Sequence, residues 1–373
     1  MNDSFETLQS KAFDWLRFPL IAFIIFLHFS YENISEAKGL FYYLEYTIGG
    51  LLSSIGVPTF FFISGYLFFA KGTWSKNAYI SKVKKRIGTL VVPYLIWNTI
   101  TVLLLLGAHA FKCHSMSEFI THVTSYPWLH SYWDINHFGV PTNWLGFNAL
   151  IYTPQNLPLW FMRDLFFACL LAPVSHWVVT TFKRYGIVLL CAIFIADIVP
   201  QVPGFRFMAF CFFTCGAYFS INRKNTVREF HNHRWFIFPI TTLISIVLLL
   251  NNNNLGASLP FLLSTLIVVA VPSVILIAAA LIKQGWTRLS PLLSSCAFFV
   301  YAMHQGVPLA HFMGKINNHL FHTEAGACVQ FLHFLFVPSA IILIDSITYC
   351  FLRRFLPRLL SLLTGNRKVR NYD

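Results

Sequence analysis

The stretch FDWLRFPLIAFIIFLHFSY, residues 13–31, is an apolar run with three ionisable side chains in it. A run of about 20 predominantly apolar residues is long enough to cross the hydrocarbon of a bilayer as a helix. Asp14 and Arg17 lie near its start, and His28 lies near its end. Ionisable groups are costly inside a membrane, so residues of this kind are candidates for function.

The composition of the whole chain is that of a membrane protein. Of the 373 residues, 56% are hydrophobic and 11% are charged, and the mean hydropathy is +0.62. Stretches that could span a bilayer occur about ten times. They cover residues 13–32, 47–70, 87–110, 157–181, 186–201, 205–222, 235–251, 258–282, 292–314 and 327–352. We therefore expect an all-α polytopic membrane protein, a bundle of about ten transmembrane helices. The fifth and sixth stretches flank the broken sequence IVPQVPGF, which a re-entrant turn would also explain.

The positive charge, formally +13 at pH 7, is concentrated in alternate segments between the predicted helices. The segments that follow even-numbered helices hold 20 of the 27 lysines and arginines. By the positive-inside rule this distribution places both termini in the cytoplasm. The charge is then a topology signal, and we expect membrane lipid rather than nucleic acid as its partner.

The chain shows no internal repeat, so we expect one transmembrane domain over residues 1–373. Residues 111–156 form the longest external loop, and its many aromatic residues suit either stacking on a sugar ring or a belt at the lipid interface. Residues 353–373 form a basic cytoplasmic tail. Its alternating basic and leucine-rich positions are typical of a short amphipathic helix on the anionic leaflet.

The three ionisable residues of the opening stretch share one face of the predicted helix. Arg17 and His28 are eleven residues apart, which is three turns plus roughly 20° and about 16 Å of rise. Asp14 lies one turn before Arg17 and can pair with it. This face must look into a protein interior or a cavity. The competing interpretation is that Asp14 and Arg17 reach the inner surface while His28 makes an interhelical hydrogen bond.

A run of cations leads into the third predicted helix: Lys82, Lys84, Lys85 and Arg86. Such a run is usually a solvated face that contacts anionic lipid. A guanidinium beside several ammonium groups at a membrane entrance would also suit a diphosphate.

Two further pairs lie in or near predicted helices. Arg163 and Asp164 are adjacent, and because neighbouring helical residues point about 100° apart, we expect them to pair with different neighbours. Tyr301 and His304 are three residues apart and share a face, although packing alone would account for His304. Other ionisable residues inside predicted helices are Asp197, His333 and Asp345.

The cysteines and the external histidines give no metal-binding pattern. Cys211 and Cys215 are four residues apart, but no histidine or carboxylate accompanies them at ligand spacing, so we expect no metal and treat the cysteines as small buried side chains. Ser64 and Gly65 favour close helix packing over catalysis.

Five blocks, taken together and in this order, resemble the acyltransferase-3 family of integral-membrane acyltransferases. The blocks are the Arg17 to His28 spacing, VPTFFFISGYLF (57–68), KKRIGTLVVPYLIWN (84–98), LPLWFMRDLF (157–166) and SSCAFFVYAMHQGV (294–307). The family transfers acyl groups, commonly acetyl from cytoplasmic acetyl-CoA, to cell-surface glycans. The resemblance implies an O-acetyltransferase of the bacterial inner membrane that uses acyl-CoA and a saccharide or lipid-linked glycan acceptor.

The resemblance also implies roles for individual residues. His28 and Arg17 would be the catalytic pair, with Asp14 beside them, and Arg86 would bind the CoA diphosphate. Many members have a second arginine three residues after Arg86, where this chain has Thr89, so Lys82, Lys84 or Lys85 would share that contact. Beside the resemblance, the candidates for orienting the acceptor or holding the base are Arg163, Asp164, Tyr301 and His304, and we expect Trp160 to bind the acceptor as well.

His28 has a suitable intrinsic pKa for a general base, which acyl transfer to a hydroxyl requires. The rival function is a secondary transporter or exporter of a glycolipid or small anion, with Asp14, Arg17 and His28 as a proton relay.

Overall fold

The computed structural model describes residues 2–29, 39–70, 72–135, 153–199, 202, 204–251, 255–256, 258–286, 291–305 and 327–366. Parts of the predicted external loop (136–152) and of the tail (367–373) therefore lie outside the described residues. The described parts are helical and contain no strand, only an isolated bridge between Val202 and Phe205. The all-α fold class is confirmed.

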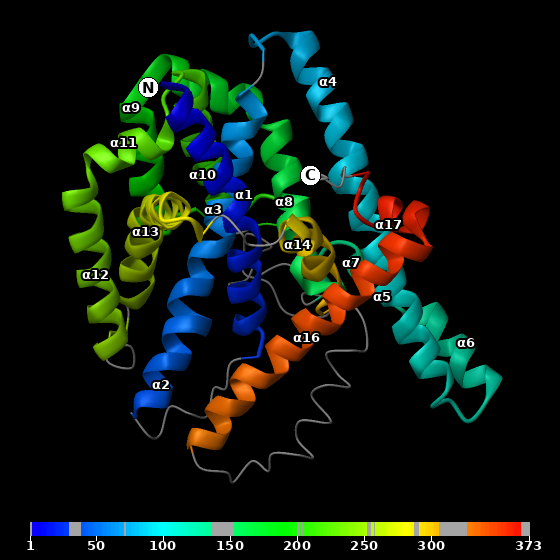
Figure 1. Cartoon of the computed structure of the whole chain (residues 1–373). Coiled ribbons are helices and arrows are strands. Elements are labelled where there is room, and N and C mark those ends of the chain that lie inside the picture. The colour runs from blue at the N-terminus through cyan, green and yellow to red at the C-terminus, as the bar shows by residue number, and fades with distance from the viewer. Residues whose placement is uncertain are drawn as a thin grey trace.

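The helices follow one another along the chain as labelled in Figure 1. They are α1 (Asn2–Leu27), α2 (Leu40–Glu45), η2 (Tyr46–Leu52), α3 (Ser53–Phe69), α4 (Lys76–Arg86), η3 (Ile87–Val91), α5 (Val92–Ala110), α6 (Met116–Ser125), α7 (Trp128–Ser131), η5 (Leu157–Leu159), α8 (Trp160–Leu170), α9 (Ala172–Ala196), α10 (Phe207–Ile221), α11 (Thr226–Asn232), α12 (Arg234–Asn251), α13 (Ser258–Lys283), α14 (Pro291–Met303), α16 (Ala327–Phe355) and α17 (Pro357–Leu363).

Among the described residues, six helical stretches are long and apolar enough to cross a membrane. They are Leu40–Phe69, Lys76–Ala110, Ala172–Ala196, Arg234–Asn251, Ser258–Lys283 and Phe331–Phe355. Helix α1 is not one of them, and its apolar sequence is interrupted by Lys11, Asp14 and Arg17. The chain is thus an integral membrane protein by its helices, while the count of about ten helices and the cytoplasmic termini stay predictions. The start of α1 and the basic helix α4 lie at the same end of the molecule (Figure 1).

Helix α9 is kinked at Lys183, whose backbone is non-helical (φ 51°, ψ −132°). The sequence predicts a boundary here, between the ranges 157–181 and 186–201. The kink divides α9 into two apolar halves at the only place where basic side chains, Lys183 and Arg184, interrupt it. Part of the IVPQVPGF stretch that follows lies outside the described residues.

Helices α3 and α10 pack backbone to backbone at two glycines. A Cβ on Gly65 would lie 1.9 Å from the carbonyl oxygen of Phe213, and a Cβ on Gly216 would lie 1.9 Å from the carbonyl oxygen of Phe62. Only glycine permits this approach, which is how helices pack tightly in membranes. The packing interpretation of Gly65 is confirmed. Helix α3 also packs against α1, so it is the centre of this part of the bundle.

The C-terminal helix α17 rests on α5. The indole Nε1 of Trp97 donates a hydrogen bond to the carbonyl oxygen of Leu363 (3.0 Å), and Leu360 and Leu363 are buried. Gly365 follows in the left-handed region (φ 68°), where a Cβ would also press on Thr89 and Pro93. The amphipathic tail helix of the sequence interpretation exists, but its buried face contacts protein.

Replacing Gly65 by alanine should destabilise the bundle, because the new methyl group meets the backbone of α10 rather than a side chain that can move. We expect the free energy of unfolding, measured by SDS titration in mixed micelles, to fall by about 1–3 kcal/mol. Gly88→Ala is the matched control, since a Cβ at Gly88 meets nothing within 4 Å. Equal stability of the two variants would show that the α3–α10 contact is looser than described.

Candidate functional site

A cavity of about 640 Å³ lies inside the bundle, walled by α1, α3, α8, α14, α16 and α17. Its wall on α3 runs from Val57 to Leu67, which corresponds to about 15 Å along the helix axis. Most of the lining is apolar, and Ser64 faces the cavity rather than a packing contact. The cavity is therefore long and mostly apolar, which suits an extended, flexible ligand.

Within the described part of the chain, three arginines line this cavity: Arg17 from α1, Arg86 from the end of α4 and Arg353 from α16. Thr89 also lines it, at the position where the family that the sequence resembles often has a second arginine. Thr89 lies in η3, a π-helical segment, and such segments are frequent at functional sites. Arg353 was not among the predicted site residues, because in the sequence it is one of several cations in a basic tail.

Arg17 and Asp14 pair as the sequence predicts, with 3.0 Å between the Nη2 and Oδ1 atoms. Arg17 lines the cavity. Asp14 does not line it, but its carboxylate pairs with the guanidinium that does. The hydroxyl of Ser294 on α14 donates to the backbone carbonyl of Asp14 (3.2 Å), which ties α1 to α14 at this level.

The lysines of α4 do not accompany Arg86 into the cavity as the described residues define it. Lys84 and Lys85 are exposed. The ammonium group of Lys82 donates to the carbonyl oxygen of Phe68 (2.7 Å), at the C-terminal end of α3, where unpaired carbonyl groups attract cations. The predicted contact of the lysines with a diphosphate stays a prediction, and the geometry favours Arg353 for that place.

His28 and His304 lie side by side, with 5.4 Å between their ring centroids. His304 is fully buried, and its Nδ1 lies 2.8 Å from the carbonyl oxygen of Tyr301. A carbonyl only accepts, so Nδ1 carries the proton and Nε2 offers a lone pair. That Nε2 has no hydrogen-bond partner among the described residues. The two histidines, predicted for different tasks, thus form one pair.

Tyr301 connects the histidine pair to the cavity. Its ring lines the cavity, and its hydroxyl donates to the carbonyl oxygen of Pro158. Tyr301 and His304 share a face as predicted, with 6.4 Å between their ring centroids. The segment around Pro158 is itself held by Asn156, whose backbone N–H donates to Oδ1 of Asn98 (3.0 Å) and whose side-chain amide donates to the carbonyl oxygen of Ala302 (3.0 Å).

Trp160, Arg163 and Asp164 gather in a buried cluster beside the cavity. Nε of Arg163 donates to Oδ1 of Asp164 (2.9 Å), so the expectation that these neighbours pair with different residues is wrong for Arg163. Its long side chain folds back across the helix to reach the adjacent carboxylate. Arg206, which the sequence analysis missed, lies 3.6 Å from Oδ2 of Asp164 and stacks on Trp160, 3.5 Å from the ring centroid.

Three buried residues that the sequence analysis did not select have one feature in common that could have identified them. Each is a polar side chain in or beside an apolar helix. They are Asn98, Asn156 and Arg206. Asp345 gives the same signal: it is fully buried, and neither carboxylate oxygen has a hydrogen-bond partner in the described part of the chain. One group of three potential metal ligands also occurs within the described residues, formed by Cys191, Cys211 and Cys215.

Comparison with known proteins agrees with the geometry. A family model described as an acyltransferase domain matches residues 10–353. The succinoglycan biosynthesis protein ExoH of Rhizobium meliloti (strain 1021) is 27% identical over 372 residues, which covers 96% of this chain and 92% of that protein. No solved structure matches the chain.

Asp164→Asn should destabilise the protein strongly, because it leaves the buried guanidinium groups of Arg163 and Arg206 without their carboxylate. Breaking a buried ion pair from one side costs about 3–5 kcal/mol. Glu229→Gln is the control, since it breaks the more exposed Glu229–Lys224 pair, for which about 0–1 kcal/mol is expected. SDS titration of both variants measures the difference, and equal losses would contradict a structural role for the cluster.

Proposed function

Because the chain belongs to the acyltransferase-3 family of integral-membrane acyltransferases, we propose that it transfers an acyl group from acyl-CoA to a hydroxyl group of a polysaccharide or its lipid-linked precursor. The observation that carries this proposal is the cavity, which has arginines at one end and Tyr301, beside the histidine pair, at the other. The arginines at one end suit the charged diphosphate of an acyl-CoA, and the mostly apolar middle suits its extended arm. The basic histidine pair at the far end suits the reaction at its thioester.

Arg86 and Arg353 bind the diphosphate of the donor in this proposal. Guanidinium groups bind phosphate oxygens in a planar, two-pronged geometry, and two of them from different helices can hold both phosphates. Arg353 then supplies the second guanidinium that this chain lacks at Thr89. Arg17, one to two turns before the apolar positions Ile21 and Ile24 of the cavity wall, meets the polar part of the pantetheine arm. The donor is acetyl-CoA, entering from the cytoplasm.

His28 acts as the general base. It takes the proton from the acceptor hydroxyl as the oxygen attacks the thioester carbonyl carbon. The carbon–sulfur bond then breaks, and the proton passes from His28 to the departing thiolate, so that the products are the ester and free CoA. No net proton is gained or lost.

His304 is a positioning residue for this base. Its Nδ1 is committed to the carbonyl of Tyr301, so only the lone pair on Nε2 is available to a neighbour. We assign that neighbour as a ring N–H of His28 in the substrate complex. The other ring nitrogen of His28 then keeps its lone pair for the acceptor proton.

The acceptor is a saccharide, in keeping with the relative from Rhizobium meliloti, which is a succinoglycan biosynthesis protein. It approaches from the end of the bundle that carries α7 and the cluster of Trp160, Arg163 and Asp164. The charged groups of these residues already contact one another. They therefore orient the acceptor indirectly, by fixing the segment of the chain to which they belong. This arrangement fits an enzyme of the bacterial inner membrane that modifies a glycan on its outer side.

His28→Ala should abolish most transfer. General-base catalysis contributes about 10²–10⁴-fold, so we expect the rate of label transfer from radiolabelled acetyl-CoA to a polysaccharide fraction to fall by that factor. His176→Ala is the control, because His176 is half-buried on α9 and stacks on Trp74 away from the cavity. Unchanged transfer by His28→Ala would remove His28 from the mechanism. Failure of the wild type to bind CoA would instead favour transport.

Arg86→Gln and Arg353→Gln should each raise the KM for acetyl-CoA by roughly tenfold or more, because a hydrogen bond to a charged group contributes about 1.5–3 kcal/mol. Lys84→Gln is the matched control from the same basic run, since Lys84 is exposed. S-acetylpantetheine, which lacks the phosphates, separates the roles: the variants and the wild type should use it equally well. A penalty that persists with this donor would place the arginines elsewhere in the mechanism.

A further inference from the structure

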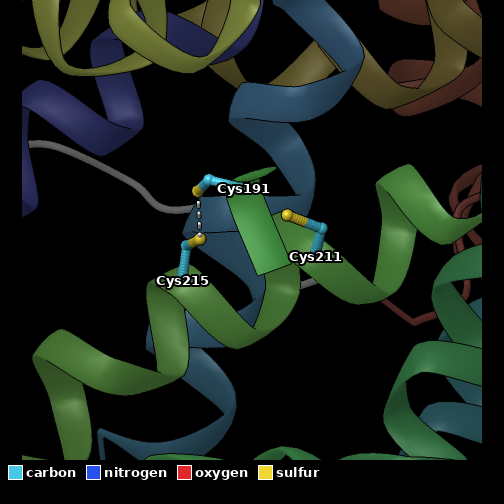
Figure 2. A group of neighbouring side chains, drawn as sticks. All are labelled: Cys191, Cys211 and Cys215. Atoms are coloured by element: carbon cyan, nitrogen blue, oxygen red, sulfur yellow. Dashed lines mark hydrogen bonds between the residues drawn. The ribbon is translucent and has the colours of Figure 1, made fainter. Parts of the chain in front are cut away.

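Three cysteine sulfurs converge between α9 and α10. Figure 2 shows Cys191 of α9 beside Cys211 and Cys215 of α10, which are one helical turn apart. All three Sγ atoms lie within 4.8 Å of one another, and those of Cys191 and Cys215 are 3.9 Å apart. Cys211 and Cys215 are buried, and Cys191 is half-buried.

These separations are those of sulfur atoms around one metal ion. A metal–sulfur bond is about 2.3 Å long, so three sulfurs in a plane around one ion lie about 4.0 Å apart. The pair at 3.9 Å already has this separation, and the remaining sulfur needs to move by less than an ångström. A rotation about a cysteine Cα–Cβ bond provides such a movement without any change in the backbone.

The backbone that carries the sulfurs is fixed by other contacts. Gly65 and Gly216 lock α10 against α3 with no room for a side chain. The hydroxyl of Ser175, in the half of α9 before the kink at Lys183, shares a hydrogen bond of 2.8 Å with the hydroxyl of Thr214 on α10. In the half that carries Cys191, Phe194 meets Phe212 of α10 edge-on, with 5.3 Å between ring centroids. The site is thus preorganised, which spares a bound ion the cost of ordering its ligands.

We propose that Cys191, Cys211 and Cys215 bind one Cu(I) ion. Sulfur ligands select soft ions, Cu(I) and zinc among them. Zinc in a structural site takes four ligands, and the described residues add no fourth cysteine, histidine or carboxylate to this group. Three sulfur ligands are sufficient for Cu(I).

Binding displaces protons from the cysteines. Each thiol that coordinates the ion releases its proton to solvent, and the resulting thiolate donates an electron pair to the copper. Copper enters as Cu(I), so no electron is transferred.

The bound ion would join the two helices as a third fixed contact. None of the three cysteines lines the cavity defined by the described residues, so the site is separate from the proposed transfer reaction. It departs from the expectation of no metal, because the pattern in the sequence contains only Cys211 and Cys215, and the third ligand comes from another helix.

The test is a titration of the full chain, purified in detergent without oxygen, with Cu(I) in competition with the chromophoric chelator bicinchoninate. The half-buried Cys113 and the exposed Cys328 are first replaced by serine to remove accessible thiols outside the group. We expect one Cu(I) per chain and a rise in the thermal unfolding temperature on binding. Cys191→Ala and Cys211→Ala in this background should each lower the affinity by at least about 100-fold, since even an outer partner of a ligand is worth 10–100-fold.

Cys169→Ala is the matched control, because Cys169 is buried on α8 outside the group and should leave binding unchanged. Cys191→Ala removes a half-buried side chain, so it tests binding even if a change at Cys211 impairs folding. Binding that survives both cluster variants overturns the proposal, as does the absence of binding in the starting protein. A thiol count that shows a Cys191–Cys215 disulfide in the anaerobic protein also overturns it.

Discussion

Lipid offers no hydrogen bonds, so each ionisable group that α1 carries into the membrane must meet protein or a cavity. Asp14 and Arg17 lie on α1 and His28 directly follows its last residue, Leu27, and the structure meets this constraint in three ways. Asp14 and Arg17 neutralise each other at 3.0 Å. Arg17 opens on the cavity, and His28 packs beside His304. Helices α14 and α16 both pack against α1.

The same constraint explains why α3 is packed so tightly on its other side. Helix α3 forms a wall of the cavity from Val57 to Leu67, so that face has few packing partners. The backbone contacts at Gly65 and Gly216 fix α3 to α10 on the side away from the cavity. Close approach of two backbones gives dispersion contacts over many atoms, which replaces the packing that the cavity removes. The cavity therefore depends on two glycines that do not face it.

The sequence predicts what depends on period and composition. The helical class, the pairing of Asp14 with Arg17, the shared face of Tyr301 and His304 and the packing role of Gly65 all follow from spacing along a single helix. Contacts between helices that are distant in the chain do not follow. Arg206 meets Asp164, and His304 meets His28, because of how the bundle closes.

Long side chains are a second reason for failure. The direction of Cβ puts Arg163 and Asp164 on different faces, yet the arginine side chain is long enough for its guanidinium to reach the adjacent carboxylate. Arg353 was missed for a related reason: basic residues after a last helix are usually solvated. Arg353 lies in the last turn of α16, and Tyr349, one turn earlier on the same helix, also lines the cavity.

The separation of charge along the cavity has a chemical consequence. The arginines sit at one end and the histidine pair lies beyond Tyr301 at the other, with apolar side chains of α1, α3 and α14 between them. In the proposed mechanism, a thioester that passes this region loses its contact with bulk water before it meets the base. Hydrolysis, the reaction that competes with transfer to a hydroxyl, then lacks its nucleophile. In the same mechanism His304 adds to this selectivity, because the Nε2 lone pair that we assign to His28 would favour one proton arrangement of the base before any acceptor arrives.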